Sequence, residues 1–131
     1  MIRRAMAVTA ATAALVLFAG SAAHAKSTET QLSNGILYFE ATDGRYVSGN
    51  PSVFFSATQY KKTGGSTTQI QLALWTTTKL IKDDARSISA GQTKGKSWGG
   101  LPKASHAPDC KATGYMIASS GKYTTPTLTF C

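Results

Sequence analysis

The chain has 131 residues, of which 42% are hydrophobic, and a formal net charge of +8 from 14 basic and 6 acidic side chains. This length fits one domain with a modest core rather than several domains. Two cysteines, and only His106 after residue 25, are too few ligands for a structural zinc site, and we expect neither metal nor cofactor.

The first 25 residues have the pattern of a secretory signal peptide. Arg3 and Arg4 give a charged start, Ala7–Phe18 is apolar, and Ala23–Ala25 matches a small-residue cleavage site. A transmembrane anchor needs about 20 apolar residues, and this run is shorter. We therefore predict an extracellular protein that is cleaved after Ala25 and has no transmembrane segment after cleavage.

Cleavage would leave 106 residues and lower the net charge from +8 to +6, because only two charged residues are removed. A basic exported domain can associate with acidic proteins or with anionic envelope polymers, and we expect no specific nucleic-acid partner. A charge of this size also serves solubility alone in many small domains. Charge by itself therefore leaves the partner open.

The mature chain begins with a polar stretch, Lys26–Ser33, that shows no hydrophobic period. We predict a flexible N-terminal arm over residues 26–34, either a spacer or a segment that orders on a partner. The folded domain then spans residues 35–131. Within it, Gly35–Ala41 is predicted as a strand that is apolar on both faces.

Two β-rich runs, Val53–Lys62 and Ser66–Thr76, flank Gly64 and Gly65. A Gly-Gly pair between such runs predicts a β-hairpin with a two-residue turn. Because side chains alternate along a strand, one face of this hairpin is apolar and is predicted to face the core: Val53, Phe55, Ala57, Ile70, Leu72 and Leu74.

The other face of the predicted hairpin places three aromatic residues among Ser, Thr, Gln and Ala. Aromatic side chains on a polar sheet face, close to lysines, suit a protein-binding patch or a carbohydrate-stacking surface. The alternative is that another part of the chain covers them as a small satellite core. Trp98, between lysines and glycines, is a further candidate contact for which burial is equally open. The candidate binding residues are Phe54, Tyr60, Lys61, Lys62, Trp75 and Trp98.

Further short strands are predicted around Leu80-Ile81, Arg86–Ala90 and Lys96–Trp98, with Ile88 pointing inward. Leu101–Asp109 contains two prolines and is predicted to be an irregular connection. The final run, from Ala112 to Phe130, is predicted to be a second hairpin that turns at Ser120-Gly121.

Cys110 and Cys131 fall on directly opposed positions at the open end of this second hairpin. An even number of cysteines in an exported protein indicates a disulfide, and the loop it closes is worth roughly 3 kcal/mol. Pro126 has no N–H for the ladder, so we expect an edge strand or a bulge there. About seven short strands with regular turn signals predict an all-β fold, a single small antiparallel β-sandwich with one disulfide.

Catalytic patterns are weak. Ala90–Ser97 loosely matches a phosphate-binding loop, but Trp98–Pro102 cannot form the helix that this chemistry needs. His106 is the sole candidate base, and its neighbours Ser105 and Asp109 share a proline-flanked loop without a supporting frame. We predict no catalytic residues and no enzymatic activity.

The layout of leader, short all-β domain and late disulfide resembles small secreted β-sandwich proteins of actinobacteria. Ser87–Thr93 is similar to a segment of the α-amylase inhibitors from Streptomyces, although their Trp-Arg-Tyr recognition triplet is absent and only one disulfide can form here. The layout also looks like the adaptor subunit of Streptomyces umbrella toxin particles. That resemblance implies that Lys26–Ser33 docks into a lectin partner.

We therefore expect a secreted, non-catalytic protein-binding module. It would be an adaptor in an extracellular toxin-type complex or an inhibitor of a secreted enzyme, and its partner would be another secreted or cell-surface protein. The alternative is a basic antimicrobial protein that acts on the envelope of competing cells, with activity that falls as salt screens its charge.

Overall fold

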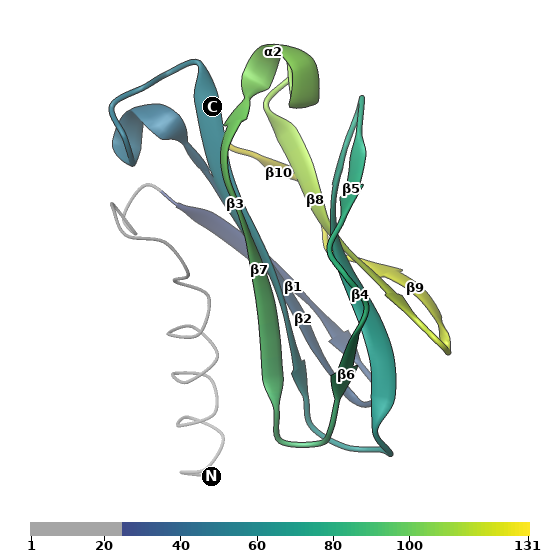
Figure 1. Cartoon of the computed structure of the whole chain (residues 1–131). Helices are drawn as coiled ribbons and strands as arrows, with labels where there is room; N and C mark the ends of the chain where they lie inside the picture. Colours follow the sequence, from purple (N-terminus) through teal and green to yellow (C-terminus); the bar gives the residue numbers. More distant parts are fainter. Residues whose placement is uncertain (1–24) are drawn as a thin grey trace, which may run out of the picture.

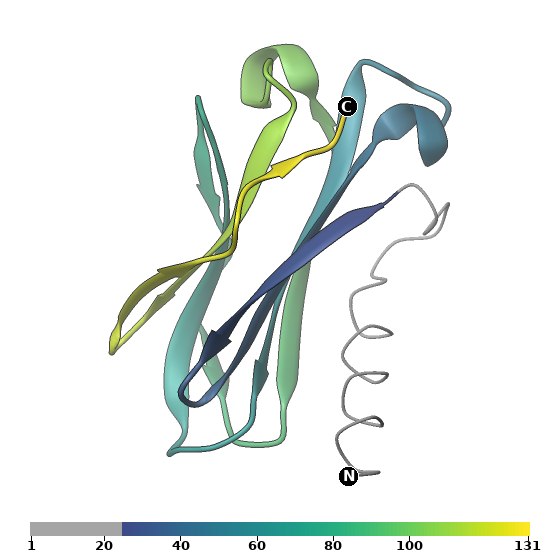
Figure 2. The same cartoon turned by 180° about the vertical axis from the view of Figure 1, so that it is seen from behind.

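The structure, a computed structural model, describes residues 25–131, and the predicted signal peptide lies outside these residues apart from Ala25. Two antiparallel sheets pack against each other and form the predicted β-sandwich (Figures 1 and 2). No helix in residues 25–131 has the length and apolar content of a membrane span.

Sheet A has four strands in the order β1-β2-β3-β7, with bounds Lys26–Leu32, Gly35–Asp43, Val53–Lys62 and Thr93–Pro102. Sheet B has the order β10-β8-β4-β5, and β6 also pairs with β4 and β9 with β8. Its strands are β4 Thr68–Thr76, β5 Leu80–Lys82, β6 Arg86–Ile88, β8 Lys111–Ala118, β9 Gly121–Thr124 and β10 Leu128–Thr129. A 3-10 turn, η2, spans Gly44–Tyr46, and a short helix, α2, spans Lys103–His106.

The stretch predicted as a flexible arm is strand β1. It pairs with β2 along its whole length, from Lys26 opposite Ala41 to Leu32 opposite Gly35. The Thr30 hydroxyl also donates to the carbonyl of Thr124 at 2.8 Å, which ties this edge to sheet B. The prediction was wrong because an edge strand can pair through its backbone without an apolar face of its own.

The predicted hairpin of Val53–Lys62 with Ser66–Thr76 is also wrong, although both strands exist. β3 pairs with β2 and β7, whereas β4 pairs with β5, β6 and β8. Residues 63–67 therefore carry the chain from one sheet to the other. The N–H groups of Thr63 and Gly64 donate to the Asn34 carbonyl at 2.8 and 3.3 Å instead of closing a hairpin turn.

This crossing reverses the expected faces of β3. Phe54 and Tyr60 point into the sandwich, while Ile70, Leu72 and Leu74 of β4 point inward as predicted. The Phe54 ring stacks on Phe130 with 4.7 Å between centroids. One core cluster contains Phe39, Ala41, Phe54, Leu74, Trp98, Ala107, Ala112 and Phe130. The second contains Leu37, Tyr60, Ile70, Leu72, Ile88 and Met116.

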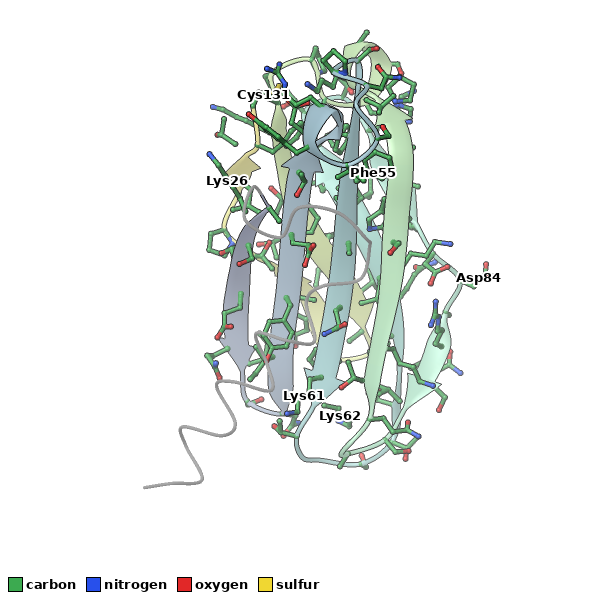
Figure 3. The ribbon with its side chains drawn as sticks, turned by 90° about the vertical axis from the view of Figure 1, so that its left-hand side faces the viewer. Lys26, Phe55, Lys61, Lys62, Asp84 and Cys131 are labelled. Carbon is green, nitrogen blue, oxygen red and sulfur yellow. A yellow bond between two sulfur atoms is a disulfide. The ribbon has the colours of Figure 1, made fainter. Side chains whose placement is uncertain are left out.

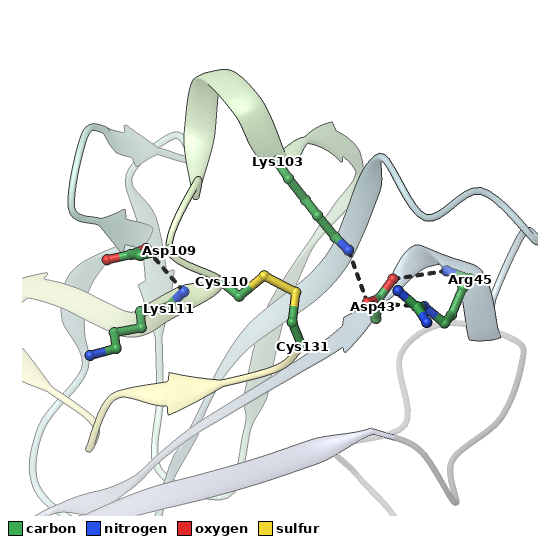
Figure 4. Close-up of a disulfide and its surroundings, with 7 residues drawn as sticks. All are labelled: Asp43, Arg45, Lys103, Asp109, Cys110, Lys111 and Cys131. Carbon is green, nitrogen blue, oxygen red and sulfur yellow. Dashed lines mark hydrogen bonds and ion pairs between the residues drawn. A yellow bond between two sulfur atoms is a disulfide. The ribbon is translucent and has the colours of Figure 1, made fainter.

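The C-terminal hairpin forms with a shifted register. Ala118 pairs with Gly121, so the turn is Ser119-Ser120, one residue earlier than predicted. Beyond Pro126 the register shifts again, in agreement with the expected bulge. The disulfide between Cys110 and Cys131 is confirmed, with 5.6 Å between the Cα atoms (Figure 4).

Candidate functional site

Among the six candidate binding residues, Trp75 is the one that is exposed, with 48% of its surface accessible. Lys61 is half-buried on the outward side of sheet A. The other four are buried, which corrects their placement on an accessible face: Phe54, Tyr60, Lys62 and Trp98. The reason is the crossing between sheets, because the aromatic residues of β3 now face the core while Trp75 of β4 faces outward.

Trp98 shows what this burial does. Its indole Nε1 donates to Thr58 Oγ1 at 3.0 Å, and Thr58 Oγ1 donates to the Ala73 carbonyl at 2.9 Å. A residue of sheet A is thereby linked to the backbone of sheet B through satisfied buried polar groups. Trp98 is a structural residue of the core.

The Trp75 face is the outward surface of sheet B around Trp75, together with Leu80, Tyr115, Lys111, Thr113 and Thr127. Trp75 lies between Leu80 on β5 and Thr113 on β8, and its ring centroid is 5.7 Å from that of Tyr115 at a tilt of 54°. An open hollow of about 540 Å³ is lined by Trp75, Thr76, Thr77, Lys111, Thr113 and Thr127.

The charge around the Trp75 face is positive. Lys82 lies opposite Ala73 and Lys111 opposite Thr129, so both positions share the outward side with Trp75, and Lys122, opposite Ile117, lies on the same side farther along β8. No Asp or Glu takes an outward position in the paired strands of sheet B within the described chain. The surface combines large apolar side chains with lysines.

Asp109 lies at the margin of this surface and is held in place by hydrogen bonds. Its carboxylate accepts from the Thr77 hydroxyl at 2.5 Å. It also accepts from the Lys111 N–H at 3.2 Å (Figure 4). The bond from Thr77 is the main cause that lowers the pKa of Asp109. Asp109 is therefore an anion that fixes the Thr77 loop beside the hollow.

The catalytic alternatives can now be placed. Ser105 Oγ lies 2.9 Å from His106 Nδ1, but both carboxylate oxygens of Asp109 bond elsewhere, as described above. A further acidic residue, Glu40 of β2, is buried opposite Ser27 and Ala57, and burial raises its pKa to about 7. Within residues 25–131 no three His, Cys, Asp or Glu side chains gather as a metal site would require.

Comparison of the chain with protein-family models, with curated proteins and with solved structures finds no match. The resemblances to actinobacterial secreted proteins stay predictions. Tyr115, Leu80 and Lys111 were missed as site residues. Alternation along Lys111–Ile117 separates Thr113 and Tyr115 from Ala112 and Gly114, and this signal could have placed Tyr115 outward.

Proposed function

We propose that the protein is a secreted, non-catalytic protein-binding module and that the Trp75 face is its contact surface. The observation that carries this proposal is the exposure of Trp75 and of its cross-strand neighbour Leu80, at 48% and 44%. Tryptophan on an accessible surface is typical of the residues that dominate binding energy in protein interfaces. The partner is another secreted or cell-surface protein, and the module acts as an adaptor in an extracellular complex or as an inhibitor of a secreted enzyme.

Two features support export and the chemistry of the partner. The predicted signal peptide and the Cys110–Cys131 disulfide both suit an oxidising extracellular compartment. The lysines around the Trp75 face suit a partner surface that carries Asp and Glu, because complementary charge steers association and selects between partners.

The experiment recovers tagged protein from the culture medium of the producing cells. It compares how much of the partner protein is captured by the original protein and by two variants. Trp75→Ala is the test variant, and Tyr46→Ala is the control because Tyr46 is 42% exposed in η2, outside sheet B. We expect the original protein and the control to recover the same partner. The Trp75→Ala variant should bind it roughly 30-fold more weakly, the loss of about 2 kcal/mol that defines a hot spot.

Equal recovery by Trp75→Ala, with an unchanged thermal midpoint, would contradict the proposal. The second candidate function, a basic antimicrobial acting on anionic envelopes, is favoured by the lysines in the paired strands of sheet B, which contain no Asp or Glu. It requires that the purified protein alone inhibits growth and that added salt suppresses the inhibition. Growth inhibition without any captured partner would put this function first.

A further inference from the structure

A second candidate site lies at the end of the sandwich away from the disulfide. A cavity of about 180 Å³ opens there between the sheets, and we call it the Lys62 cavity. Figure 3 shows Lys62 at this end and Cys131 at the other. The polar side chains that line the cavity include those of Asn34, Tyr60, Lys62, Ser120 and Tyr123.

Lys62 is a buried lysine without a counter-charge. It is 3% exposed, and none of the ion pairs or side-chain hydrogen bonds within residues 25–131 involves its ammonium group. Its Nζ atom is not among the fully enclosed polar atoms without a partner, so the ammonium group opens to the cavity, where a ligand can reach it. The chain supplies a counter-charge elsewhere, where Lys103 Nζ lies 2.9 Å from the buried Asp43 carboxylate.

Two tyrosine hydroxyls lie in the lining of the cavity beside Lys62. The Tyr60 hydroxyl has no hydrogen-bond partner in the described part of the chain, whereas the Tyr123 hydroxyl is paired with Ser120 Oγ at 2.7 Å. Burial, and then the neighbouring Tyr123, raise the pKa of Tyr60, so its hydroxyl keeps the proton that it can donate. The unused hydrogen-bonding capacity of this cavity therefore includes an ammonium group and a phenol, beside the side chains of Ser33, Asn34 and Ser66.

Gly65 leaves room for this arrangement. A Cβ at Gly65 would lie 2.9 Å from Asn34 Nδ2 and 3.3 Å from Lys62 Nζ, and its φ of +78° is one that favours glycine. Two nitrogen head groups can therefore lie close together under the turn that links β3 to β4. The Lys62 charge makes this end of the cavity attract an anion rather than a cation, and the neutral Asn34 amide can donate to it.

We propose that the Lys62 cavity binds a carboxylate, with the Lys62 ammonium as its counter-charge and the Tyr60 hydroxyl as a hydrogen-bond donor. One ammonium group matches a singly charged ligand, whereas phosphate is typically held by several cations or by a nest of backbone amides. The cavity volume equals that of about six waters at roughly 30 Å³ each, which suits a carboxylate on a short stem.

Two sources can provide this group: a free small carboxylate, or the side chain of an acidic residue on a partner protein. The site does not depend on the Trp75 face. Its lining residues Thr68 and Ile70 belong to the start of β4, and Trp75 lies near the end of that strand. The proposal can therefore fail while the proposed function holds, and the reverse is also true.

The experiment titrates purified protein, produced from the full chain, with sodium acetate, with acetyl-glutamate amide and with inorganic phosphate, using sodium chloride to match ionic strength. Binding is followed by NMR through the backbone amide resonances of residues that line the cavity, such as Asn34 and Ser66, which are present in every variant. We expect saturation with a dissociation constant of roughly 1 to 10 mM for one of the two carboxylates. Lys62→Met should weaken binding about tenfold or more and Tyr60→Phe about threefold, in line with the loss of a charged and of a neutral hydrogen bond. The neighbouring Lys61→Met should bind as the original protein does.

Saturation by acetate means that the source of the carboxylate is a free small molecule. Saturation by the glutamate derivative alone means that the source is an acidic side chain of a partner protein. Three results overturn the proposal: no saturation by either carboxylate, equal binding by Lys62→Met, or tighter binding of phosphate than of both carboxylates. Tyr60→Phe keeps the test decisive if Lys62→Met alters the loop, since it removes one hydroxyl and preserves the ring.

Discussion

At the scale of single residues, two buried charged side chains have opposite surroundings: one has counter-charges within the described part of the chain and the other has none. The Asp43 carboxylate is 3% exposed and is bound by Lys103 Nζ at 2.9 Å and Arg45 Nε at 3.3 Å (Figure 4). Lys62 is buried to the same degree, yet no carboxylate in residues 25–131 lies against it. The first arrangement stabilises the fold, and the second leaves a binding site incomplete.

Lys62→Met should leave the stability of the free protein unchanged or raise it by about 1 kcal/mol, because it replaces a charge that no carboxylate pairs with an apolar side chain of similar length. Lys61→Met, on the opposite side of the same strand, should change the stability by less than about 0.5 kcal/mol. Urea unfolding at neutral pH measures both differences. A clear loss of stability in Lys62→Met would mean that the ammonium already has a satisfactory environment.

Asp43→Asn should lower the stability by about 3 kcal/mol at pH 7, since it leaves Lys103 without its counter-charge. Burial raises the pKa of Asp43, but the hydrogen bonds from Lys103 and the Arg45 N–H, with their charges, bring it below the ordinary value of 3.8. A lowered pKa means that the stabilising effect is complete above the unfolded value and is lost as the pH falls through the folded one.

The unfolding free energy of the original protein should therefore fall below about pH 4, and part of that fall should be missing in Asp43→Asn. Asp84→Asn, in an exposed loop, serves as the matched control. Identical acid profiles for the original protein and Asp43→Asn would contradict the assignment of this ion pair as a stabilising contact.

At the scale of elements, strand positions were readable from the sequence but strand partners were not. β2, β3, β4 and the core of β8 appear close to where alternation and turn signals place them. Gly64-Gly65 is compatible with a tight hairpin and equally with a crossing between sheets. The hydrogen bonds from the Thr63 and Gly64 N–H groups to the Asn34 carbonyl favour the crossing over the hairpin. Because Asn34 is distant in sequence, local sequence signals cannot predict these bonds.

The same limit explains the errors in the candidate site. β3 has aromatic residues on both sides, with Phe54 and Tyr60 on one side and Phe55 on the other, so alternation cannot say which side is inward. β4 has its large aliphatic residues, Ile70, Leu72 and Leu74, on one side, and there Trp75 was placed correctly. The polar strand β1 was missed because its contribution is backbone pairing at a sheet edge.

β1 should behave as an integral strand. Deletion of Lys26–Leu32 should destabilise the domain by more than about 3 kcal/mol, because seven residue pairs with β2 and the Thr30 contact to β9 are lost. In the intact protein, amide hydrogen exchange should show protection in the middle of β1 comparable to that of β2. If the β1 amides exchange as fast as those of an unstructured peptide, residues 26–34 are a flexible arm, as the sequence predicted.

At the scale of the whole molecule, the sandwich separates two surfaces with different chemistry. The Trp75 face spreads over the outward side of sheet B near the disulfide end of β8, and the Lys62 cavity opens between the sheets at the opposite end. An adaptor needs such separate contact points, since it must hold more than one group at a time. Of the two surfaces, we propose the Trp75 face as the contact surface for the partner protein.

Site-specific photocrosslinking tests directly whether the partner protein contacts the Trp75 face. A benzophenone amino acid replaces Trp75 in one variant and Tyr46 in the other, and each is illuminated in the producing culture. We expect a covalent adduct with an exported protein from position 75 and none from position 46. An adduct from position 46 alone, or a captured partner that never crosslinks to position 75, would contradict it.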